Sequence, residues 1–490
     1  MLPPTRLCRR LRHSPSDNFF MASRVLLIST NRCTQPEAVF PLGLAHVSAA
    51  LRRAGHDTRW MDYHADSEPL SAVLAGYHPD FVGVSIRNVD DVLIRKRETF
   101  VGELATITET VHAVNPCPVI LGGSGYSIFP RRLLQLARAD YGIQGEGEES
   151  FSALVSALAG DGDITTIPGL VYHRGGEMVA NPRCSFHESA GVEIADRPAH
   201  LVSQYLRDAG MLNLQTQRGC AHACCYCTYP LIEGRTHRRR TPEVVAEEMA
   251  QLERQGAKYV FIVDSVFNSS PKHVIETCEA ILRRNVKIRW GCFLRPQGLS
   301  GSLMDLMARA GLAHIEFGSD SFCDSVLEAY GKRLTFEDIR QASDLARAQR
   351  VDFCHYLICG GPGETMQTLQ TSFENSQLLP GAVIMAVAGM RIYPETPLCK
   401  RALQEGQITA DTDLLAPAYY LAPGLTEAGI FARLQEFSAR SPIWIVGDPT
   451  PTYTRLVERL RSRGVAGPLW SYFSMMQRLW PSVPANANQL

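Results

Sequence analysis

Short apolar runs alternate with amphipathic stretches along residues 24–159, and the same alternation returns from about residue 211. This pattern is typical of parallel strands connected by helices. The sequence therefore predicts an α/β protein with two such halves. In the first half, the expected strands are residues 25–28, 58–61, 81–85, 119–122 and 141–143.

The connections in the first half favour a flavodoxin-like, or Rossmann-like, sheet. Residues 42–54 are an expected helix that stops at Gly55, because glycine readily adopts the left-handed conformation that ends many helices. In such a sheet the ligand site lies beyond the carboxyl ends of the strands. Residues 161–210 predict a linker that contains a small β-hairpin, since turn residues separate its two short apolar runs.

The second half predicts a partial (β/α)6 barrel of the TIM type. Thr241 is the expected N-cap of a helix that runs to Gln255. A small or charged residue follows most of the strands, and these positions should meet at one mouth of the barrel. The expected strands are residues 212–216, 259–263, 288–294, 314–318, 356–358 and 383–386.

The last 90 or so residues predict one more strand and helix, at 443–446 and 453–463, followed by a segment rich in aromatic residues and methionine. Such a segment more often packs a core than covers a substrate as a lid. The expected domains are thus a disordered extension (1–22), a ligand-binding domain (23–160), the linker (161–210), the barrel (211–400) and a small α/β-helical C-terminal region that lies near the substrate (401–490).

The composition narrows the class of protein but does not identify its chemistry. The chain has 490 residues, is 45% hydrophobic and carries a formal net charge of -1, so it offers no long-range attraction for nucleic acid or an anionic membrane. No apolar run approaches the roughly 18 residues that a transmembrane helix needs. Most of the 14 cysteines are scattered singly, which predicts a reducing, cytoplasmic location.

Three cysteines, Cys220, Cys224 and Cys227, stand at a C-x3-C-x2-C spacing after the first strand of the second half. Three thiolates from one short loop can hold an iron-sulfur cubane, which normally takes four ligands, so one iron would stay open. An open coordination position distinguishes a catalytic metal centre from a structural one. The alternatives are a zinc site, with His222 as an awkwardly placed fourth ligand, a redox pair, or a chance spacing; Cys225 is an additional thiol inside the run.

This loop resembles the signature of the radical S-adenosylmethionine (SAM) enzymes, in which the open iron chelates SAM and an aromatic residue before the third cysteine lies beside the adenine. The resemblance covers about residues 212–400. Taken singly, each polar residue at a strand end is explained as well by a surface ion pair or a helix cap. The resemblance implies a 4Fe-4S cluster on Cys220, Cys224 and Cys227, and SAM contacts at Tyr226, Asp264, Arg295, Glu316, Gly318, Ser319, Gly361 and Arg391.

The loops after three strands of the first half are rich in glycine or serine, and glycine allows a large ligand to approach the backbone. In this order, ahead of the cysteine loop, they resemble the cobalamin-binding domain that precedes many radical SAM enzymes. The motif D-x-H-x-x-G, which supplies a histidine to cobalt in the methionine-synthase branch, is missing, and the similar Asp62-Tyr63-His64 follows the wrong strand. The resemblance implies cobalamin contacts at Ser85, Asn88, Gly122, Gly123, Ser124, Gly145 and Glu146.

Together the two resemblances imply a cobalamin-dependent radical SAM C-methyltransferase. It would act on an unactivated carbon of a small-molecule or lipid-like substrate, through a 5'-deoxyadenosyl radical and methylcobalamin, with flavodoxin or ferredoxin as external electron donor. An oxidative cyclase or ring-rearranging enzyme with the same cofactors is one alternative, and a non-catalytic cobalamin or iron-sulfur sensor is another. A methylthiotransferase is disfavoured because no second cysteine triplet precedes residue 220.

Overall fold

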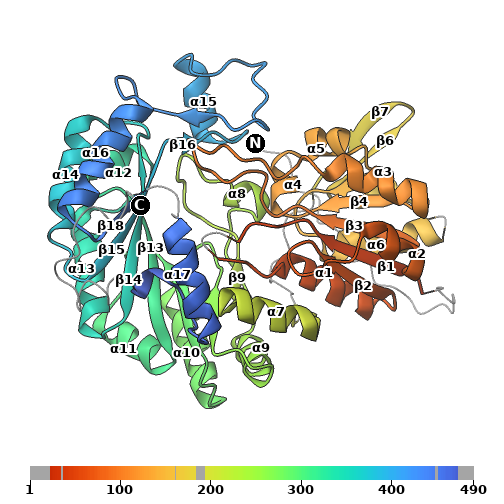
Figure 1. Ribbon diagram of the computed structural model, residues 1–490, viewed down its shortest axis with the longest axis horizontal. Helices are drawn as coiled ribbons and strands as arrows, with labels where there is room; N and C mark the ends of the chain where they lie inside the picture. The colour runs from red at the N-terminus through yellow and green to blue at the C-terminus, as the bar shows by residue number, and fades with distance from the viewer. Residues whose placement is uncertain (1–21, 35–36, 161, 184–193, 447–450, 473–490) are drawn as a thin grey trace, which may run out of the picture.

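The computed structural model describes residues 22–34, 37–160, 162–183, 194–446 and 451–472. They form two α/β halves that lie side by side, the first coloured red to yellow and the second green to blue (Figure 1). The expected N-terminal extension lies outside these ranges except for Ala22, so its disorder stays a prediction.

Seven strands form the sheet of the first half, in the order β2-β1-β3-β4-β5-β6-β7. The first five are parallel and confirm the flavodoxin-like order. Successive residues of β1, such as Leu26 and Leu27, are buried in different hydrophobic clusters, because both faces of the sheet are covered. These strands are β1 (Arg24–Ser29), β2 (Asp57–Asp62), β3 (Phe81–Ser85), β4 (Val119–Gly122) and β5 (Tyr141–Ile143).

The predicted hairpin is part of this sheet and does not stand apart in a linker. Strands β6 (Leu170–Arg174) and β7 (Glu177–Ala180) are antiparallel, and β6 pairs with the edge of β5. The pairing satisfies the edge of β5 and buries the first three residues of β6. The hairpin therefore extends the first half, a feature that the turn residues alone did not predict.

Helices on both sides of the first sheet end much as the sequence predicts. Helix α1 ends at Arg53, and Gly55 has a φ of +89°, the left-handed conformation expected there. The helices are α1 (Leu42–Arg53), α2 (Leu70–Tyr77), α3 (Leu104–Val114), α4 (Ser124–Ile128), α5 (Pro130–Ala137) and α6 (Glu148–Ala159).

The second half contains a parallel sheet of seven strands, one more than predicted, in the order β18-β15-β14-β13-β12-β11-β8. The seventh strand, β18 (Trp444–Val446), is the strand expected in the C-terminal region, and it pairs with β15. No pairing joins β8 to β18 among the described residues, so the barrel is partial. The other strands are β8 (Leu212–Leu214), β11 (Tyr259–Ile262), β12 (Arg289–Leu294), β13 (Leu312–Asp320), β14 (Asp352–Cys359) and β15 (Ala382–Ala388).

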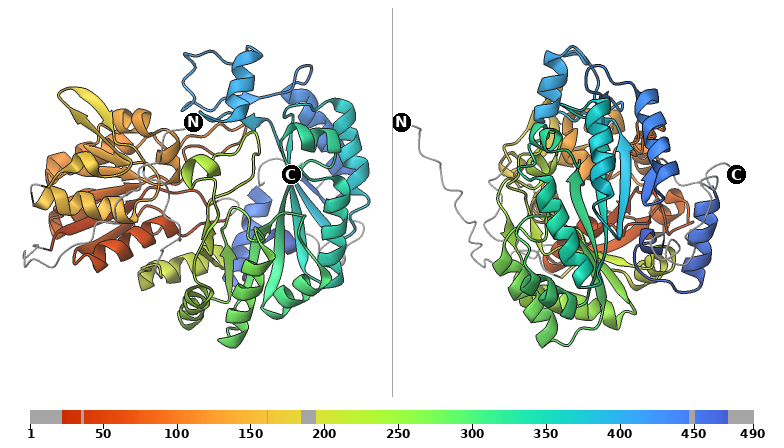
Figure 2. Two further views of the ribbon diagram at one scale, coloured as in Figure 1. Left: turned by 180° about the vertical axis from the view of Figure 1, so that it is seen from behind. Right: turned by 90° about the vertical axis from the view of Figure 1, so that its left-hand side faces the viewer.

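Helices lie along the outside of this fan of strands (Figure 2). Thr241 occupies the N-cap position of α9 as predicted, but its side chain makes no capping hydrogen bond, and the helix ends one residue earlier than expected. The outer helices are α9 (Pro242–Arg254), α10 (Pro271–Arg283), α11 (Gly301–Arg309), α13 (Phe336–Ala348), α14 (Met366–Ser376) and α16 (Glu427–Arg440).

Among the described residues, no helix has the length and apolar character to cross a membrane.

Short elements connect the two halves and build the loops of the barrel mouth. The connecting elements are η1 (Ile164–Thr166), α7 (Ala199–Ala209), β9 (Gln217–Arg218), α8 (Tyr229–Ile232), β10 (Arg238–Arg239), α12 (Asp324–Ala329), β16 (Met390–Arg391), α15 (Pro397–Gln404), β17 (Tyr419–Tyr420) and α17 (Pro451–Ser462).

The described part of the aromatic C-terminal segment packs into the barrel. Trp470 is buried against Cys354 and Val383, which belong to β14 and β15. This confirms the core role expected of Trp470. The residues from Phe473 onward, including Met475, Met476 and Trp480, lie outside the described residues.

Candidate active site

The cysteine loop begins where β9 ends, and its first turn requires glycine. Gly219 has a φ of +85°, and a Cβ there would lie 2.1 Å from the carbonyl oxygen of Thr236. The next residue, Cys220, is buried and donates its backbone N–H to the carbonyl of Gly234 at 3.0 Å. The Arg218-Gly219 pair ahead of the first cysteine is thus explained by a close approach of two backbone segments.

The rest of the loop is fixed by backbone contacts with the barrel. The N–H of Cys225 donates to the carbonyl of Tyr330 at 2.9 Å, and the carbonyl of Cys225 accepts from Leu398 at 2.9 Å. Gly331 lies so close that a Cβ there would meet the carbonyl oxygen of Ala223 at 2.7 Å. These contacts hold the backbone around Cys224 and leave its thiol free for a ligand role.

The thiols of the cysteine loop lie in surroundings where a thiolate is stable only beside a positive charge. Burial raises the pKa of Cys224, and it raises the pKa of Cys227 to about 12. A bound metal supplies that charge and deprotonates a coordinating thiol. No three His, Cys, Asp or Glu side chains of the described residues converge as ligands of one metal ion would. Cubane ligands bind different irons, so they need not converge on one point.

A buried network beside the loop involves Tyr226. Its hydroxyl donates to a carboxylate oxygen of Asp320, and the same oxygen lies 2.7 Å from the ammonium nitrogen of Lys332. Burial alone would lower the pKa of Lys332, but Asp320 and the nearby Cys224 outweigh it and raise the pKa. The network holds the aromatic ring of Tyr226 at the carboxyl end of β13 and places a fixed cation near Cys224.

Arg295, at the end of β12, also lies beside the cysteine loop. Its guanidinium donates to the carbonyl oxygens of Lys332 and, at 2.9 Å, of Arg333. Burial lowers the pKa of Arg295, while the charge of Cys224 opposes that effect. The structure therefore brings Arg295, Tyr226 and the cysteines together, as the sequence predicts, although contact with SAM itself stays a prediction.

The glycine turn after β14 is connected to the cysteine loop by one side chain. The hydroxyl of Tyr330 donates to the carbonyl of Ile358 at 2.7 Å and accepts from the N–H of Gly361 at 3.1 Å. Glu364 accepts from the N–H of Gly360, and burial raises the pKa of this carboxyl to about 7. Because the backbone carbonyl of Tyr330 also holds Cys225, Tyr330 fixes the two loops relative to each other.

Glu316 and Ser319 lie on opposite faces of β13. Glu316 accepts from the hydroxyl of Tyr356 at 2.9 Å and from the indole N–H of Trp470 at 3.0 Å, and burial raises its pKa. The hydroxyl of Ser319 instead bonds to a ring nitrogen of His355 at 2.8 Å, among core aromatics. Of the predicted SAM contacts on β13, Gly318 remains open, since a Cβ there would meet only the Lys332 ammonium, at 3.8 Å.

Asp264 and Arg391 use their polar atoms within the protein. Asp264 accepts from the backbone N–H groups of Thr216 and Gln217, at 2.7 and 3.2 Å, and so shapes the start of the cysteine loop. Burial raises its pKa to about 7. Arg391 forms a buried ion pair of 2.8 Å with Asp90 of the first half. Both residues have positioning roles that sequence reasoning missed, and the predicted SAM contacts stay untested.

The loops of the first half form a cradle at the carboxyl ends of its strands. A Cβ at Gly123 would lie 2.5 Å from the carbonyl oxygen of Ile86, whereas a Cβ at Gly122 would meet nothing within 4 Å. The hydroxyl of Ser124 donates to the carbonyl of Arg87 at 2.8 Å. Gly123 and Ser124 thus join the β3 and β4 loops, which include Ser85 and Asn88, and Gly122 leaves open space beside them.

Glu146, predicted to contact a ligand, lies in an ion-pair network that connects the two halves. It pairs with Arg238, whose Nη1 lies 2.9 Å from its Oε2, and with Arg218 at 3.5 Å. Arg218 also pairs with Glu148. Burial alone would raise the pKa of Glu148, but Arg218 outweighs it and holds the pKa below its ordinary value. At Gly145, the neighbouring predicted contact, an added Cβ would point into nearly open space.

Three residues near these loops were not predicted. Tyr330 and Lys332 follow the short helix α12, where no strand-end pattern marks them. Arg87 lies between Ser85 and Asn88, and a cation inside a predicted ligand loop is a signal that could have found it. Burial lowers the pKa of Arg87, and no side-chain hydrogen bond or ion pair of its guanidinium occurs within the described ranges.

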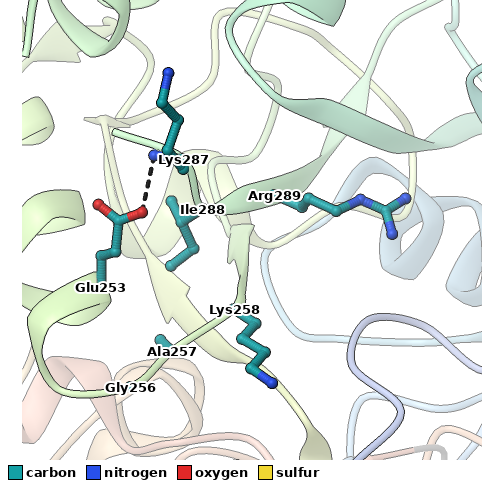
Figure 3. A pocket seen from close by; sticks show the side chains of 7 residues that line it. All are labelled: Glu253, Gly256, Ala257, Lys258, Lys287, Ile288 and Arg289. Atoms are coloured by element: carbon teal, nitrogen blue, oxygen red, sulfur yellow. Dashed lines mark hydrogen bonds between the residues drawn. The ribbon is translucent and has the colours of Figure 1, made fainter. Parts of the chain in front are cut away.

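A shallow pocket of 410 Å³ lies at the opposite end of the barrel (Figure 3). Its lining residues immediately precede or begin β11 and β12, as Lys258 and Arg289 do. Glu253 accepts the backbone N–H of Lys287 at 2.9 Å. Since the cysteine loop lies at the carboxyl ends of the strands, this pocket is separate from the candidate site.

Two family models match the two halves. The B12 binding domain matches residues 34–155, and the Radical SAM superfamily matches residues 214–375. The chain is a cobalamin-dependent radical SAM enzyme. This confirms the fold class and the cofactors expected from the sequence, and the alternative of a sensor without turnover is not retained.

Curated relatives of this radical SAM enzyme differ in what they act on. The tryptophan 2-C-methyltransferase of Streptomyces laurentii is 26% identical over 451 residues, which are 78% of this chain and 74% of that protein. The hopanoid C-3 methylase of Methylococcus capsulatus is 27% identical over 63% of this chain and 58% of its own length. The anaerobic magnesium-protoporphyrin IX monomethyl ester cyclase of Cereibacter sphaeroides is 25% identical over 68% of this chain and 56% of its own.

Solved structures share the whole architecture. The radical SAM methyltransferase TsrM from Kitasatospora setae superposes with a TM-score of 0.85, at 24% identity, over 94% of this chain and 99% of that chain. The cobalamin-dependent enzyme OxsB superposes with a TM-score of 0.69, at 16% identity, over 96% and 81% of the two chains. At these identities the likeness shows a common fold.

The residues present fit the cofactors of these two families. The cysteine loop offers three thiols that burial disfavours as free thiolates, and Gly122 leaves space in the cradle of the first half. Arg87 adds a half-buried cation to that cradle. His64 is held by Asp208 at 2.9 Å and packs on Tyr205.

Proposed function

We propose that the chain is a C-methyltransferase that acts on an unactivated carbon of a small-molecule or lipid-like substrate. The observation that carries the proposal is the buried ion-pair network of Arg218, Arg238, Glu146 and Glu148, which joins the cysteine loop to the cradle loops. Relatives named for methylation act on tryptophan, a hopanoid and a cytidylyl-2-hydroxyethylphosphonate, which supports methyl transfer with a variable substrate.

When bound, the cluster with SAM supplies a carbon radical able to remove hydrogen from an unactivated carbon, and the corrinoid supplies a methyl group. The chain's own residues hold and enclose these groups. Cys220, Cys224 and Cys227 would ligate the cluster, and Tyr226 and Arg295 would contact SAM. The cradle at Gly122 would take the nucleotide tail of the corrinoid, with Arg87 beside it.

The barrel interior supports a partly apolar substrate. Glu316 has both oxygens occupied by Tyr356 and Trp470, so this part of the interior offers aromatic surface and no free carboxylate oxygen. A water-excluding wall protects a radical from side reactions. An external carrier would deliver the electron that the cluster needs.

An oxidative cyclase with the same cofactors is the second candidate. Alignment with the cyclase of Cereibacter sphaeroides covers 68% of this chain, at nearly the identity of the methyltransferases. The two reactions leave different products, because methyl transfer consumes SAM as a methyl source as well as a radical source.

The test uses protein reconstituted anaerobically with iron, sulfide and methylcobalamin, then incubated with SAM, dithionite and an extract of candidate metabolites. The expected result is formation of 5'-deoxyadenosine and S-adenosylhomocysteine in a ratio near one, with a substrate that gains a methyl group. Formation of 5'-deoxyadenosine without S-adenosylhomocysteine would support the cyclase. If neither compound forms, the proposal fails.

Substitution of Gly122 by leucine should weaken cobalamin binding about tenfold or more, equivalent to at least about 1.4 kcal/mol. The added side chain would enter the open space of the cradle without meeting other atoms at its Cβ. Binding is measured by titration of hydroxocobalamin followed by its absorbance. Gly76→Leu, on an exposed face of α2 that also has nothing within 4 Å, is the matched control and should bind normally. Equal affinities of the two variants would remove Gly122 from the site.

A further inference from the structure

Along β14, the side chains that point into the barrel become less buried toward the cysteine loop. His355 points outward, since its ring bonds to the hydroxyl of Ser343 on the outer helix α13 at 3.1 Å. Alternate residues of a strand lie on opposite faces, so the residues on either side of His355 point inward. Of the inward residues, Cys354 is fully buried, whereas Tyr356 and Ile358 are half-buried. The barrel interior is therefore filled at the amino end of the strand and accessible toward the candidate site.

Trp470 lies where this change in burial occurs. It packs on Cys354 and on Val383, which are paired neighbours on β14 and β15. Its indole N–H donates to Glu316 at 3.0 Å, and Glu316 lies at the same level of the sheet, since it pairs with Cys354. The ring of His314, two residues earlier on β13, meets the indole edge-on at a centroid distance of 5.5 Å. Trp470 thus closes the accessible part of the interior from below.

The segment that carries Trp470 is fixed by a buried ion pair with the first half. Arg461 of α17 lies 2.8 Å from the carboxylate of Glu37, and the N–H of Leu469 donates to the same carboxylate oxygen at 3.3 Å. Arg461 also donates to the carbonyl of Gly467 at 2.9 Å. A Cβ at Gly467 would lie 2.8 Å from the ring of Tyr259, so the segment lies closely against the barrel. These contacts hold Trp470 in one position.

Above Trp470, toward the cysteine loop, the wall of the barrel interior is mostly apolar. The hydroxyl of Tyr356 is directed to Glu316, to which it donates at 2.9 Å. Gly318 leaves open space, because a Cβ there would meet only the Lys332 ammonium, at 3.8 Å. This region suits a compact apolar group. The other half-buried residues of this wall are Phe293, Ile358, Met385 and Val387.

We propose that Trp470 is a specificity-determining residue, which limits how deeply the apolar part of the substrate enters the barrel. The inference rests on the proposed function, because it requires a substrate between the cysteine loop and the barrel interior. A wall of fixed side chains discriminates by size, since a longer group must displace it. The buried part of the substrate is then a compact group, such as a ring system or a short branched chain, and a long straight chain is excluded.

The test uses protein reconstituted anaerobically with iron, sulfide and hydroxocobalamin, with SAM present and no reductant, so that the cofactors occupy their own sites. Binding of straight-chain primary alcohols, from butanol to dodecanol, is measured by equilibrium dialysis and gas chromatography of the free alcohol. The affinity should rise about fourfold with each methylene until the chain reaches Trp470, and then stop rising. In Trp470→Leu, this limit should move to chains at least about two methylenes longer, because the substitution leaves a cavity.

Trp444→Leu is the matched control. Trp444 is also a buried tryptophan whose indole N–H makes one hydrogen bond, to the hydroxyl of Ser376 at 3.0 Å. Its ring packs on Phe437 of the outer helix α16, on the other face of the sheet from Trp470. This control should keep the chain-length limit of the wild type. Trp470→Phe is a milder variant that preserves more of the packing, and it should move the limit by less than Trp470→Leu.

The absence of alcohol binding to the wild type, or an affinity that rises without a limit, would overturn the inference. So would a limit that is the same in the wild type and both Trp470 variants. An equal shift in Trp444→Leu would also overturn it, because the change would then come from a general loosening of the barrel. If dithionite drives no SAM cleavage in the wild type, the proposed function fails. The dialysis involves no turnover and still decides the role of Trp470.

Discussion

The variant Cys224→Ala is expected to abolish SAM cleavage after anaerobic reconstitution with iron and sulfide. Cys224 is the middle residue of the triplet, and its chain neighbours are fixed, Cys225 by a hydrogen bond to the carbonyl of Tyr330 and Ala223 by the close approach of Gly331. Loss of its thiol removes a ligand from a loop that supplies only three, so the cubane has no replacement ligand at that iron. Iron and sulfide content, the electron paramagnetic resonance of the reduced protein and the yield of 5'-deoxyadenosine measure the effect.

Cys225→Ala is the matched control, since the two cysteines are adjacent. The thiol of Cys225 packs in a hydrophobic cluster with Tyr330 and Leu398, and burial raises its pKa to about 12. Its structural contribution to the loop comes from backbone hydrogen bonds, which alanine preserves. The control should keep its cluster and its activity. A cluster that survives in Cys224→Ala but not in Cys225→Ala would reassign the ligand set.

Much of the fold could be predicted because parallel strands buried on both faces read as continuous apolar runs. All five parallel strands expected in the first sheet and all six strands expected in the barrel occur close to their predicted positions. Which sheet edge a given strand pairs with could not be predicted in the same way. Whether the 170–180 hairpin or the strand at 444–446 joins a sheet depends on a free strand edge elsewhere in the chain, as β5 and β15 provide.

In the candidate site, too, the local motif could be predicted and the long-range contacts could not. The cysteine spacing is local, so the motif identifies the loop without any knowledge of the fold. Asp264, Arg391 and Glu146 also follow strands as predicted, but their partners come from distant segments. Arg391 pairs with Asp90, about 300 residues earlier in the chain, and Glu146 pairs with Arg238. Sequence position shows that a polar residue lies at the carboxyl end of a strand, whereas only the packed structure shows whether it faces a ligand or another side chain.

These long-range pairs make the two halves one functional unit. Glu148 begins α6 of the first half, directly after the Gly145 loop, and Arg218 immediately precedes the Gly219 turn of the cysteine loop. A shift of the cradle would therefore change the position of an arginine two residues from Cys220. Arg391 with Asp90 provides a second buried connection between the halves. The two buried connections hold the loops of the two cofactor sites in a fixed relation, which is the preorganisation that the proposed methyl transfer would require.

The substitution Arg218→Met should lower the free energy of unfolding by about 3–5 kcal/mol, because it leaves a buried carboxylate without its cation. Glu148 forms its ion pair with Arg218, and both side chains are mostly buried, whereas Glu146 would keep Arg238. Denaturant unfolding of the apoprotein measures the loss, and cobalamin and iron content after reconstitution should fall with it. Arg138→Met, which breaks the exposed pair with Glu109, should cost less than about 1 kcal/mol.

A double variant decides whether the ion pair or the packing of Arg218 is responsible. Replacement of both partners by methionine, in Arg218→Met with Glu148→Met, removes the unpaired charge and should recover most of the lost stability, since buried pairs often give little net stabilisation over apolar residues. If cofactor content also recovers, the network contributes through folding alone. If stability recovers while the cluster and cobalamin do not, the charges themselves position the loop. A single variant as stable as wild type would contradict the buried network.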